Sequence, residues 1–320
     1  MLSFLSRHSS LLLMLSAIFG FIFPTISAVV FPFLPYILFF LMLFTLLGMK
    51  QHELINLLGQ LNIWFYACFH AIALSVIACS ISGLLGASSS MLLAISAVTA
   101  TGSLFATPAI ARSVGLDALK AMAMTIASTL MMPAVLYINF LLFQDSNFSL
   151  DMQSYIQRLM IFILGPMCLS ALCYRLIPHN LLHRTHAKLS QVTIVLVFTF
   201  PFGLVGEFRK MFDRSFTHGL SFLLIGIALC ILFFLAAFLF YRRQGLDPAL
   251  LAAITAANRN VLLTYTVAGA YLGPEYMALM GAIQLPTYSL PLLVKALSKY
   301  CSPPSTNDMQ NKKNSLQNHQ

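Results

Sequence analysis

The chain has 320 residues, of which 59% are hydrophobic and only 8% are charged, and its formal net charge at pH 7 is +9. Soluble domains carry about 25% charged residues, so this composition excludes a soluble globular protein and indicates an all-α polytopic protein whose main partner is the lipid bilayer. The basic residues form no patch interleaved with aromatic side chains, so nucleic acid is not an expected partner.

Ten apolar segments follow one another along the chain, each close to the roughly 20 residues that cross a bilayer as a helix. We predict membrane helices over residues 10–30, 32–48, 61–82, 91–113, 117–141, 155–177, 189–206, 217–242, 248–271 and 276–297. The first follows Arg7 as the apolar part of a signal peptide would. Phe23 and Pro24 interrupt it and no small-residue cleavage site follows, so we assign it as a membrane helix. The polar residues 302–320 are predicted to form a disordered tail.

The distribution of lysine and arginine predicts the orientation, because these residues are more frequent in cytoplasmic loops. Twelve lie on the side that holds both termini: Arg7, Lys50, Arg112, Arg175, Arg184, Lys188, Arg242, Arg243, Lys295, Lys299, Lys312 and Lys313. Four lie on the opposite side: Arg158, Arg209, Lys210 and Arg214. We therefore expect a plasma (inner) membrane protein with a cytoplasmic N-terminus at residues 1–9 and a cytoplasmic tail.

Ten helices divide into two units of five, over residues 10–141 and 155–297. An odd-numbered unit that occurs twice must insert with opposite topology the second time, which gives two inverted five-helix repeats. The fourth and ninth helices are therefore counterparts, and each contains a polar interruption, at residues 99–108 and 258–260. Paired interruptions of this kind are the sequence feature that best indicates a transporter binding site. Kinked helices without a ligand are the alternative.

The two interruptions differ in chemistry. In the first, Pro108 removes a backbone donor and Gly102 lowers the cost of irregular backbone. The second contains Arg259, a charge inside an apolar run, which usually faces a partner, a cavity or a substrate path. We predict that the substrate-binding residues are Thr101, Ser103, Thr107, Pro108, Asn258, Arg259 and Asn260. An arginine that only stabilises helix packing is the alternative.

Two longer stretches have the order and spacing of a known family. The first runs from Gly102 to Pro133, and the second runs from Ala256 to Pro286. They resemble the bile acid:sodium symporter family, which belongs to a wider group with auxin efflux carriers. The resemblance covers nearly the whole chain. It implies a panel domain of helices 1, 2, 6 and 7, and a core domain of the other six, in which helices 4 and 9 are broken and cross beside the substrate and sodium sites.

The resemblance also implies ion-coupling positions. A helix 9 glutamate of the family corresponds to Thr255, two helix 5 hydroxyl positions correspond to Lys120 and Met124, and a helix 3 glutamine corresponds to His70. The implied ion-coupling residues are His70, Lys120, Ser128, Thr129 and Thr255. Sodium needs oxygen ligands, best with a carboxylate, so Thr255 and two nearby cations argue against the usual sodium sites. The alternatives are that Lys120 extends to the membrane interface or pairs with Asp117, and that His70 packs between helices.

The sequence therefore predicts a secondary transporter that moves a small organic anion, bile-acid-like or another carboxylate, by alternating access. No cofactor, catalytic residue or metal site is expected, and the coupling ion is sodium or a proton. A proton-coupled or uncoupled carrier is the first alternative, and a channel is the second. An intramembrane enzyme is disfavoured because the chain has no paired membrane aspartates, no His-Glu-x-x-His and no Gly-x-Ser-x-Gly.

Overall fold

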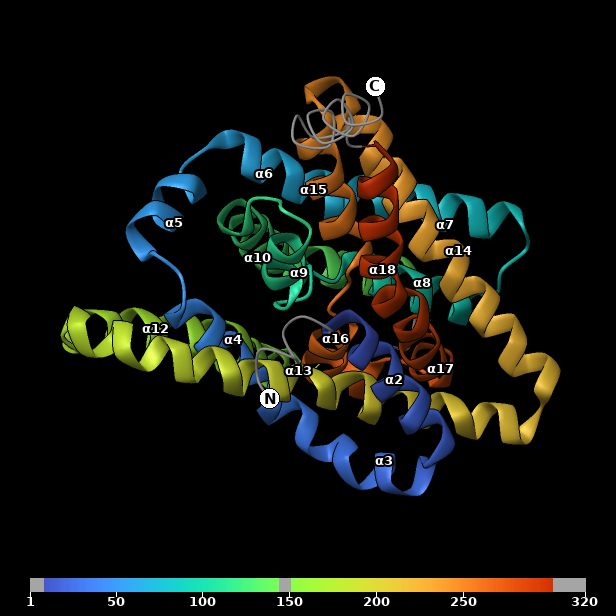
Figure 1. Cartoon of the computed structure of the whole chain (residues 1–320). Coiled ribbons are helices and arrows are strands. Elements are labelled where there is room, and N and C mark those ends of the chain that lie inside the picture. Colours follow the sequence, from blue (N-terminus) through green and yellow to red (C-terminus); the bar gives the residue numbers. More distant parts are fainter. Residues whose placement is uncertain (1–8, 144–150, 302–320) are drawn as a thin grey trace, which may run out of the picture.

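The computed structural model describes residues 9–143 and 151–301, and within these ranges it is helical, without a β-strand (Figure 1). Five helical segments in these ranges are long and apolar enough to cross a membrane: Pro24–Leu47, Leu61–Leu84, Ala118–Phe143, Met152–Leu176 and Phe216–Gln244. Shorter apolar helices accompany them. The protein is therefore a helical membrane protein, as its composition predicts. The expected tail at 302–320 and residues 1–8 of the expected N-terminus lie outside the described residues.

The first helices of the chain are α2 (Ser9–Ile22), α3 (Pro24–Val30), a 3-10 turn at Phe31–Phe33, α4 (Leu34–Leu47) and α5 (Gln51–Leu58). The chain breaks at Phe23 and not at residue 31 as predicted. A residue before proline avoids the helical conformation, and Phe23 has φ −114° and ψ 65°. Pro24 then opens α3, where its missing N–H costs nothing. Helix α3 therefore continues through the 3-10 turn into α4 as one span.

The middle of the chain contains α6 (Leu61–Cys68), α7 (Leu74–Leu84), α8 (Ser89–Ala100), α9 (Thr107–Ser113) and α10 (Ala118–Phe143). A π-helical segment at Phe69–Ala73 joins α6 to α7. The second half contains α11 (Met152–Leu159), α12 (Gly165–Leu176), α13 (His179–Arg214), α14 (Phe216–Tyr241), α15 (Leu246–Ala257), α16 (Val261–Ala268), α17 (Pro274–Ala282) and α18 (Gln284–Cys301). Another π-helical segment, Met160–Leu164, joins α11 to α12. The tenth predicted helix is thus interrupted at Ile283.

Helix α13 is longer than the predicted span at 189–206, because it continues to Arg214. The charged run expected to be a loop forms ion pairs along the helix instead. Lys210 Nζ lies 2.6 Å from Glu207 Oε1, and Arg209 Nε lies 2.8 Å from Asp213 Oδ1. Pairs three or four residues apart stabilise a helix. The sequence prediction was wrong here because it read these charges as a break.

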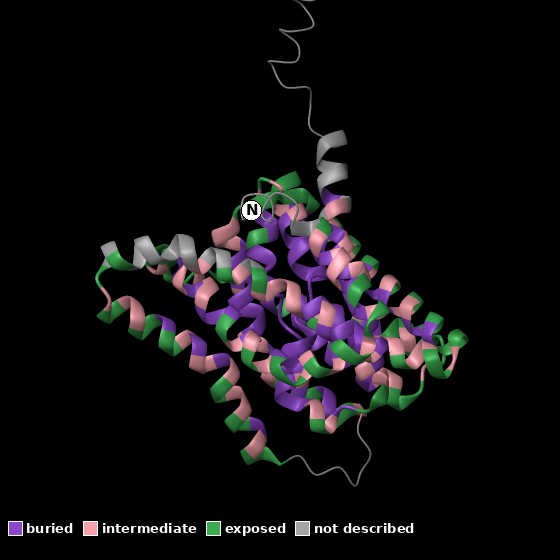
Figure 2. Ribbon diagram, turned by 60° about the horizontal axis from the view of Figure 1, so that its bottom comes forward, coloured by how far each residue is buried: buried purple, intermediate pink, exposed green. Residues whose placement is uncertain are grey.

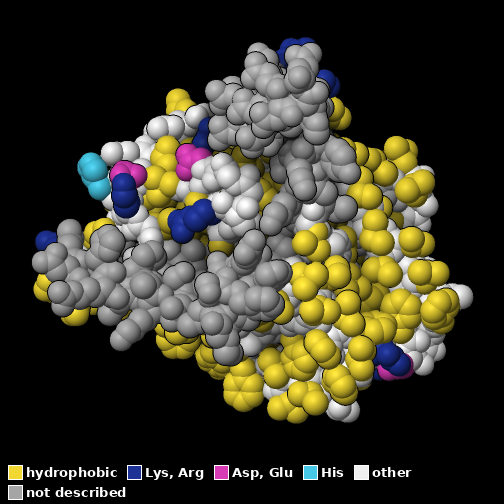
Figure 3. Space-filling view, viewed as in Figure 1, with side chains coloured by type: hydrophobic (Ala, Val, Ile, Leu, Met, Phe, Trp, Pro, Cys, Tyr) yellow, Lys and Arg dark blue, Asp and Glu magenta, His cyan; other side chains and the backbone are white. Residues whose placement is uncertain are grey.

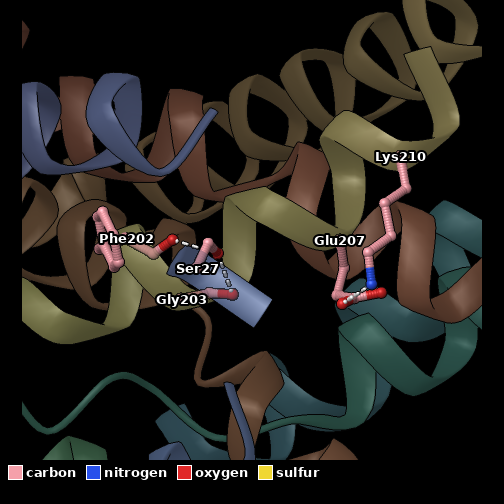
Figure 4. A network of polar contacts seen from close by, with 5 residues as sticks. All are labelled: Ser27, Phe202, Gly203, Glu207 and Lys210. Carbon is pink, nitrogen blue, oxygen red and sulfur yellow. Dashed lines mark hydrogen bonds and ion pairs between the residues drawn. The ribbon is translucent and has the colours of Figure 1, made fainter. Parts of the chain in front are cut away.

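Helix α13 packs along α2 and α3. In Figure 4, the hydroxyl of Ser27 in α3 donates to the backbone carbonyls of Phe202 and Gly203, at 2.8 and 3.0 Å. A Cβ on Gly20 of α2 would lie 2.2 Å from the carbonyl oxygen of Phe202. The backbones of α2 and α13 therefore approach as closely as small residues permit in membrane helix packing.

Large hydrophobic side chains cover the outside of the molecule. Figure 2 shows buried residues at the centre of the bundle and exposed or intermediate residues on its outer helices. The exposed fractions of Leu61 and Leu84 are 85% and 89%. Figure 3 shows a broad hydrophobic area on the face viewed, over the side where α14 and α17 lie. An apolar surface this large needs a non-aqueous environment, and lipid supplies it.

Candidate functional site

Both predicted polar interruptions are non-helical in the structure. Helix α8 ends at Ala100 and α9 begins at Thr107, while α15 ends at Ala257 and α16 begins at Val261. Between them the backbone is extended or irregular, as at Thr101 with φ −63° and ψ 144°. The prediction that these two helices are discontinuous is confirmed.

The two interruptions cross and hydrogen-bond to each other. Ser103 and Arg259 form an isolated antiparallel bridge. The Leu104 amide donates to the Asn258 carbonyl at 2.8 Å, and the Asn260 amide donates to the Gly102 carbonyl at 2.9 Å. Backbone groups freed by two helix ends therefore satisfy one another, as buried backbone requires. We call residues 101–106 and 258–260 the crossover.

Hydroxyl groups reinforce this backbone pairing. Thr101 Oγ1 donates to the Asn260 carbonyl at 2.7 Å, and Ser103 Oγ donates to the Asn258 carbonyl at 3.2 Å. Thr107 Oγ1 lies 3.1 Å from Ser103 Oγ. These predicted site residues and Pro108 are buried. Pro108 stands in the first turn of α9, where proline is favoured, so it starts the second half-helix.

Helix α10 packs directly against the crossover. The amide of Ser103 donates to Ser128 Oγ at 3.1 Å. A Cβ on Gly102 would lie 2.5 Å from Thr129 Oγ1 and 2.6 Å from Thr129 Cα. Only glycine permits so close an approach of the two backbones. Ser128 and Thr129, predicted to couple ions, therefore contact the crossover itself.

Arg259 lies at the centre of the crossover with an exposed fraction of 1%. Its Nη1 donates to three backbone carbonyls, those of Thr99 at 2.8 Å, Thr101 at 3.1 Å and His70 at 3.2 Å. Its Cζ lies 4.3 Å from the centroid of the Phe233 ring, a cation–π contact. Within residues 9–143 and 151–301, no carboxylate forms an ion pair with it.

Among the described residues, the other edge of the Arg259 guanidinium has no hydrogen-bond partner. Its Nε and Nη2 are buried and unpaired, and so are the side-chain amide atoms of Asn258 and Asn260. A buried donor without a partner costs about 1–3 kcal/mol, and more when it is charged. Nε and Nη2 lie on one edge of the planar group, and two parallel N–H donors are the arrangement that binds a carboxylate bidentately.

His70 joins the π-helical segment between α6 and α7 to the crossover. Its Nε2 lies 3.0 Å from the Thr101 carbonyl oxygen, and its Nδ1 lies 3.1 Å from the Tyr66 hydroxyl. A carbonyl only accepts, so Nε2 carries the proton and Nδ1 accepts from Tyr66 in the neutral ring. The ring therefore positions the broken end of α8, while the His70 carbonyl binds Arg259.

Thr255 is buried on α15, and its hydroxyl donates to the Leu251 carbonyl one turn earlier, at 2.6 Å. This bond lies within one helix, so the hydroxyl is directed along its own backbone. The position that the family resemblance matches to a glutamate thus places no charged oxygen beside the crossover.

Among the described residues, no hydrogen bond or ion pair joins the side chain of Lys120 or Met124 to the crossover. Both line a separate cavity of about 50 Å³ with Tyr66, Tyr241 and others. The pairing of Lys120 with Asp117, one of the alternatives for this lysine, is absent from the ion pairs of the described residues. Asp117 Oδ1 instead accepts from the backbone amides of Leu119 and Lys120, at 2.9 and 3.0 Å, because a carboxylate before a helix satisfies its first free amides.

Sequence reasoning missed two aromatic residues at this site. Tyr66 lies four residues before His70, a spacing that puts both on one helix face, so the pair could have been found. Phe233 lies in the uniformly apolar α14, and nothing in that sequence distinguishes it from its neighbours.

No protein-family model matches the chain, and no curated protein matches it. The contacts of the crossover and the order of motifs along the sequence are therefore the features that point to a function. Among these contacts, the buried and half-paired guanidinium of Arg259 is the most informative.

Proposed function

We propose that the protein is a secondary transporter that moves a small organic anion bearing a carboxylate across the membrane by alternating access. One observation carries the proposal. The Nε–Nη2 edge of Arg259 is buried and unpaired between two crossed, broken helices. A fixed cation with a free bidentate edge matches the charge and the planar geometry of a carboxylate.

The neighbouring amides support the same assignment. Asn258 and Asn260 each have a buried side-chain oxygen and nitrogen without a partner. Together they offer donors and acceptors to the polar groups of a substrate. Thr101 and Ser103 are less available, because their hydroxyls already donate to carbonyls of the crossover. We therefore assign the substrate contacts first to Asn258, Arg259 and Asn260.

The helix arrangement supports ten spans. Helix α5 has only 8 residues and is too short to span a membrane. Without it, the described helices form ten consecutive segments when α3 is joined with α4, α6 with α7, α8 with α9, α11 with α12, α15 with α16 and α17 with α18. The two broken helices are then the fourth and the ninth, which are counterparts in two inverted repeats of five. We propose this architecture, and with it the resemblance to the bile acid:sodium symporter family.

The packing of the segments supports a division into two groups. Helix α13 packs on α2, α3 and α4, and α12 packs on α4, while α10 packs on α6, α8 and α9. Helix α13 also packs on α14 and α17, and α2 packs on α18, so the two groups share an interface. We propose that the groups are the panel and core domains that the resemblance implies. We propose that one group rocks against the other and exposes Arg259 to each side of an inner membrane in turn, because Arg259 is closed off from both sides in this conformation.

Purified protein reconstituted into liposomes tests the proposal. A panel of radiolabelled carboxylates is compared with their neutral amides in uptake and in thermal-shift measurements. We expect at least one carboxylate, and not its amide, to raise the Tm and to enter with saturable kinetics. Counterflow, in which internal unlabelled substrate accelerates uptake of labelled substrate, separates a carrier from a channel. Linear uptake without counterflow, or no response to any carboxylate, contradicts the proposal.

A further inference from the structure

Three backbone carbonyls converge on one nitrogen of Arg259. The oxygens of Thr99, Thr101 and His70 lie 2.8, 3.1 and 3.2 Å from Nη1. Thr99 and Thr101 stand at the C-terminal end of α8, and His70 stands in the π-helical segment before α7. The three oxygens therefore come from two interrupted places in the backbone, brought together around one cation.

Three converging carbonyl oxygens are suited to bind a cation. Carbonyls at a helix C-terminus lack intrahelical partners and lie at the negative end of the helix dipole. Unwound backbone and the C-terminal ends of half-helices coordinate cations in membrane transporters. Without a positive charge, three converging carbonyl dipoles repel one another in a site that excludes water.

We propose that this carbonyl cluster is a cation site that Arg259 fills permanently, so that the protein needs no coupling cation. The guanidinium is covalently attached to α15–α16 and cannot cross the membrane or dissociate. No ion gradient can then drive substrate accumulation through this site. The carrier therefore equilibrates its substrate across the membrane or exchanges one substrate molecule for another. The transport part of this inference rests on the proposed function, whereas the cation site rests on the geometry alone.

Removing the side chain tests the cation site without any substrate. In Arg259→Ala the three carbonyls lose their cation, and we expect the Tm of the purified protein to fall by several degrees. Millimolar guanidinium, which is the missing group as a free ion, should restore at least half of the lost Tm. Tetramethylammonium at equal ionic strength should not restore it, because that cation has no N–H donor. The wild type should show neither response.

Two further variants serve as controls for the guanidinium response of Arg259→Ala. Arg209→Ala removes an exposed arginine that pairs with Asp213, and its Tm should not respond to guanidinium. Arg259→Lys keeps a cation on the same backbone position and should also be insensitive. Recovery of Arg209→Ala, or no recovery of Arg259→Ala, would overturn the cation site. If Arg259→Ala cannot be purified, Arg259→Gln, whose side chain is neutral and two bonds shorter than arginine, takes its place with the same expectations.

The wild type gives a test that needs no variant. Uptake of the best carboxylate is measured with sodium and potassium replaced by N-methylglucamine, with and without a pH gradient. We expect the initial rates of uptake to be unchanged by these replacements. In a separate experiment with an imposed sodium gradient, we expect no accumulation of the carboxylate above equilibrium. Strict dependence on sodium or on the pH gradient overturns the inference but leaves the proposed function standing. Loss of saturable uptake under every condition removes the proposed function, while guanidinium rescue of Arg259→Ala still decides the cation site.

Discussion

Ser103 and Arg259 come from opposite halves of the chain and form an antiparallel bridge inside the membrane bundle. The hydrogen bonds on either side of it, at 2.8 and 2.9 Å, use the backbone amides and carbonyls that two broken helices leave free. The backbone at the crossover is therefore satisfied internally, as membrane interiors require. Among the described residues, the side chains of Asn258, Arg259 and Asn260 are left with unpaired polar atoms. The proposed function therefore assigns binding to side-chain atoms of the same three residues whose backbone holds the crossover together.

Gly102 should be essential for the crossover. In Gly102→Ala, the new Cβ would lie 2.6 Å from Thr129 Cα and 2.7 Å from Thr129 N, so α10 must move away from the broken end of α8. We expect destabilisation of about 1–3 kcal/mol, as for other overpacked sites, seen as a lower Tm in detergent. Gly83→Ala is the matched control, because a Cβ there meets no atom within 4 Å. Equal Tm values for the two variants would contradict the close approach.

The Ser128 hydroxyl should matter more than the Thr255 hydroxyl. Ser128→Ala leaves the buried Ser103 amide without its acceptor, and an unsatisfied buried donor costs about 1–3 kcal/mol. Thr255→Val removes a bond to the Leu251 carbonyl within the same helix and an interaction with the Tyr66 hydroxyl. We expect a smaller loss, below about 1 kcal/mol, because the Tyr66 hydroxyl keeps His70 and the Ala252 carbonyl as partners.

Transport by Thr255→Val gives a second measurement. Thr255→Val should keep full uptake, because its hydroxyl lies along its own helix. Abolished uptake with an unchanged Tm would instead mean that Thr255 binds an ion or substrate, as the family resemblance implies for that position.

The positions of the breaks could be predicted from the sequence because proline, glycine and polar residues interrupt apolar runs for local reasons. Gly102, Pro108 and Arg259 each mark an interruption by their own chemistry, and the structure places all three at or beside the crossover. The partners of Arg259 could not be predicted. They are backbone carbonyls, which every residue has, so no residue type identifies them.

The end of α13 could not be predicted for a similar reason. The span predicted to end at residue 206 continues to Arg214, because the charges from Glu207 to Arg214 are spaced so that they pair along the helix. The family resemblance implies that Lys120 couples an ion, and the structure places it in the wall of a cavity with Tyr66 and Tyr241. Sequence order gave its helix correctly, but the face of the helix depends on packing that a single sequence does not show.

Lys120 should act on substrate capture and not on coupling. Its cavity also contains Tyr241, whose buried hydroxyl has no hydrogen-bond partner. A cation in a cavity raises the local concentration of anions, an effect that salt screens. Lys120→Met should therefore raise the KM for a carboxylate several-fold at low ionic strength with an unchanged kcat, and the difference should shrink at high salt. Lys210→Met, which removes a lysine paired with Glu207, should leave the KM unchanged.

One result would reverse this assignment. If Lys120→Met, and not Lys210→Met, made uptake dependent on sodium, then the Lys120 ammonium would occupy a cation position in the transport cycle. The cavity would then be an ion site, and the fixed cation of the protein would be Lys120 in place of Arg259.

Arg259→Lys separates the two roles that the geometry gives to Arg259. A lysine ammonium can donate to the carbonyls of Thr99 and Thr101, but it has no planar edge with two parallel donors. We expect the purified variant to keep most of its Tm and to ignore guanidinium, because a cation still fills the carbonyl cluster. Carboxylate affinity should fall at least tenfold, since a lost charge-assisted bond contributes about 1.5–3 kcal/mol. Arg209→Lys, at an exposed ion pair, should change neither property. A variant with wild-type carboxylate affinity would show that the Nε–Nη2 edge does not bind substrate, and a variant that guanidinium stabilises would show that lysine does not reach the cluster.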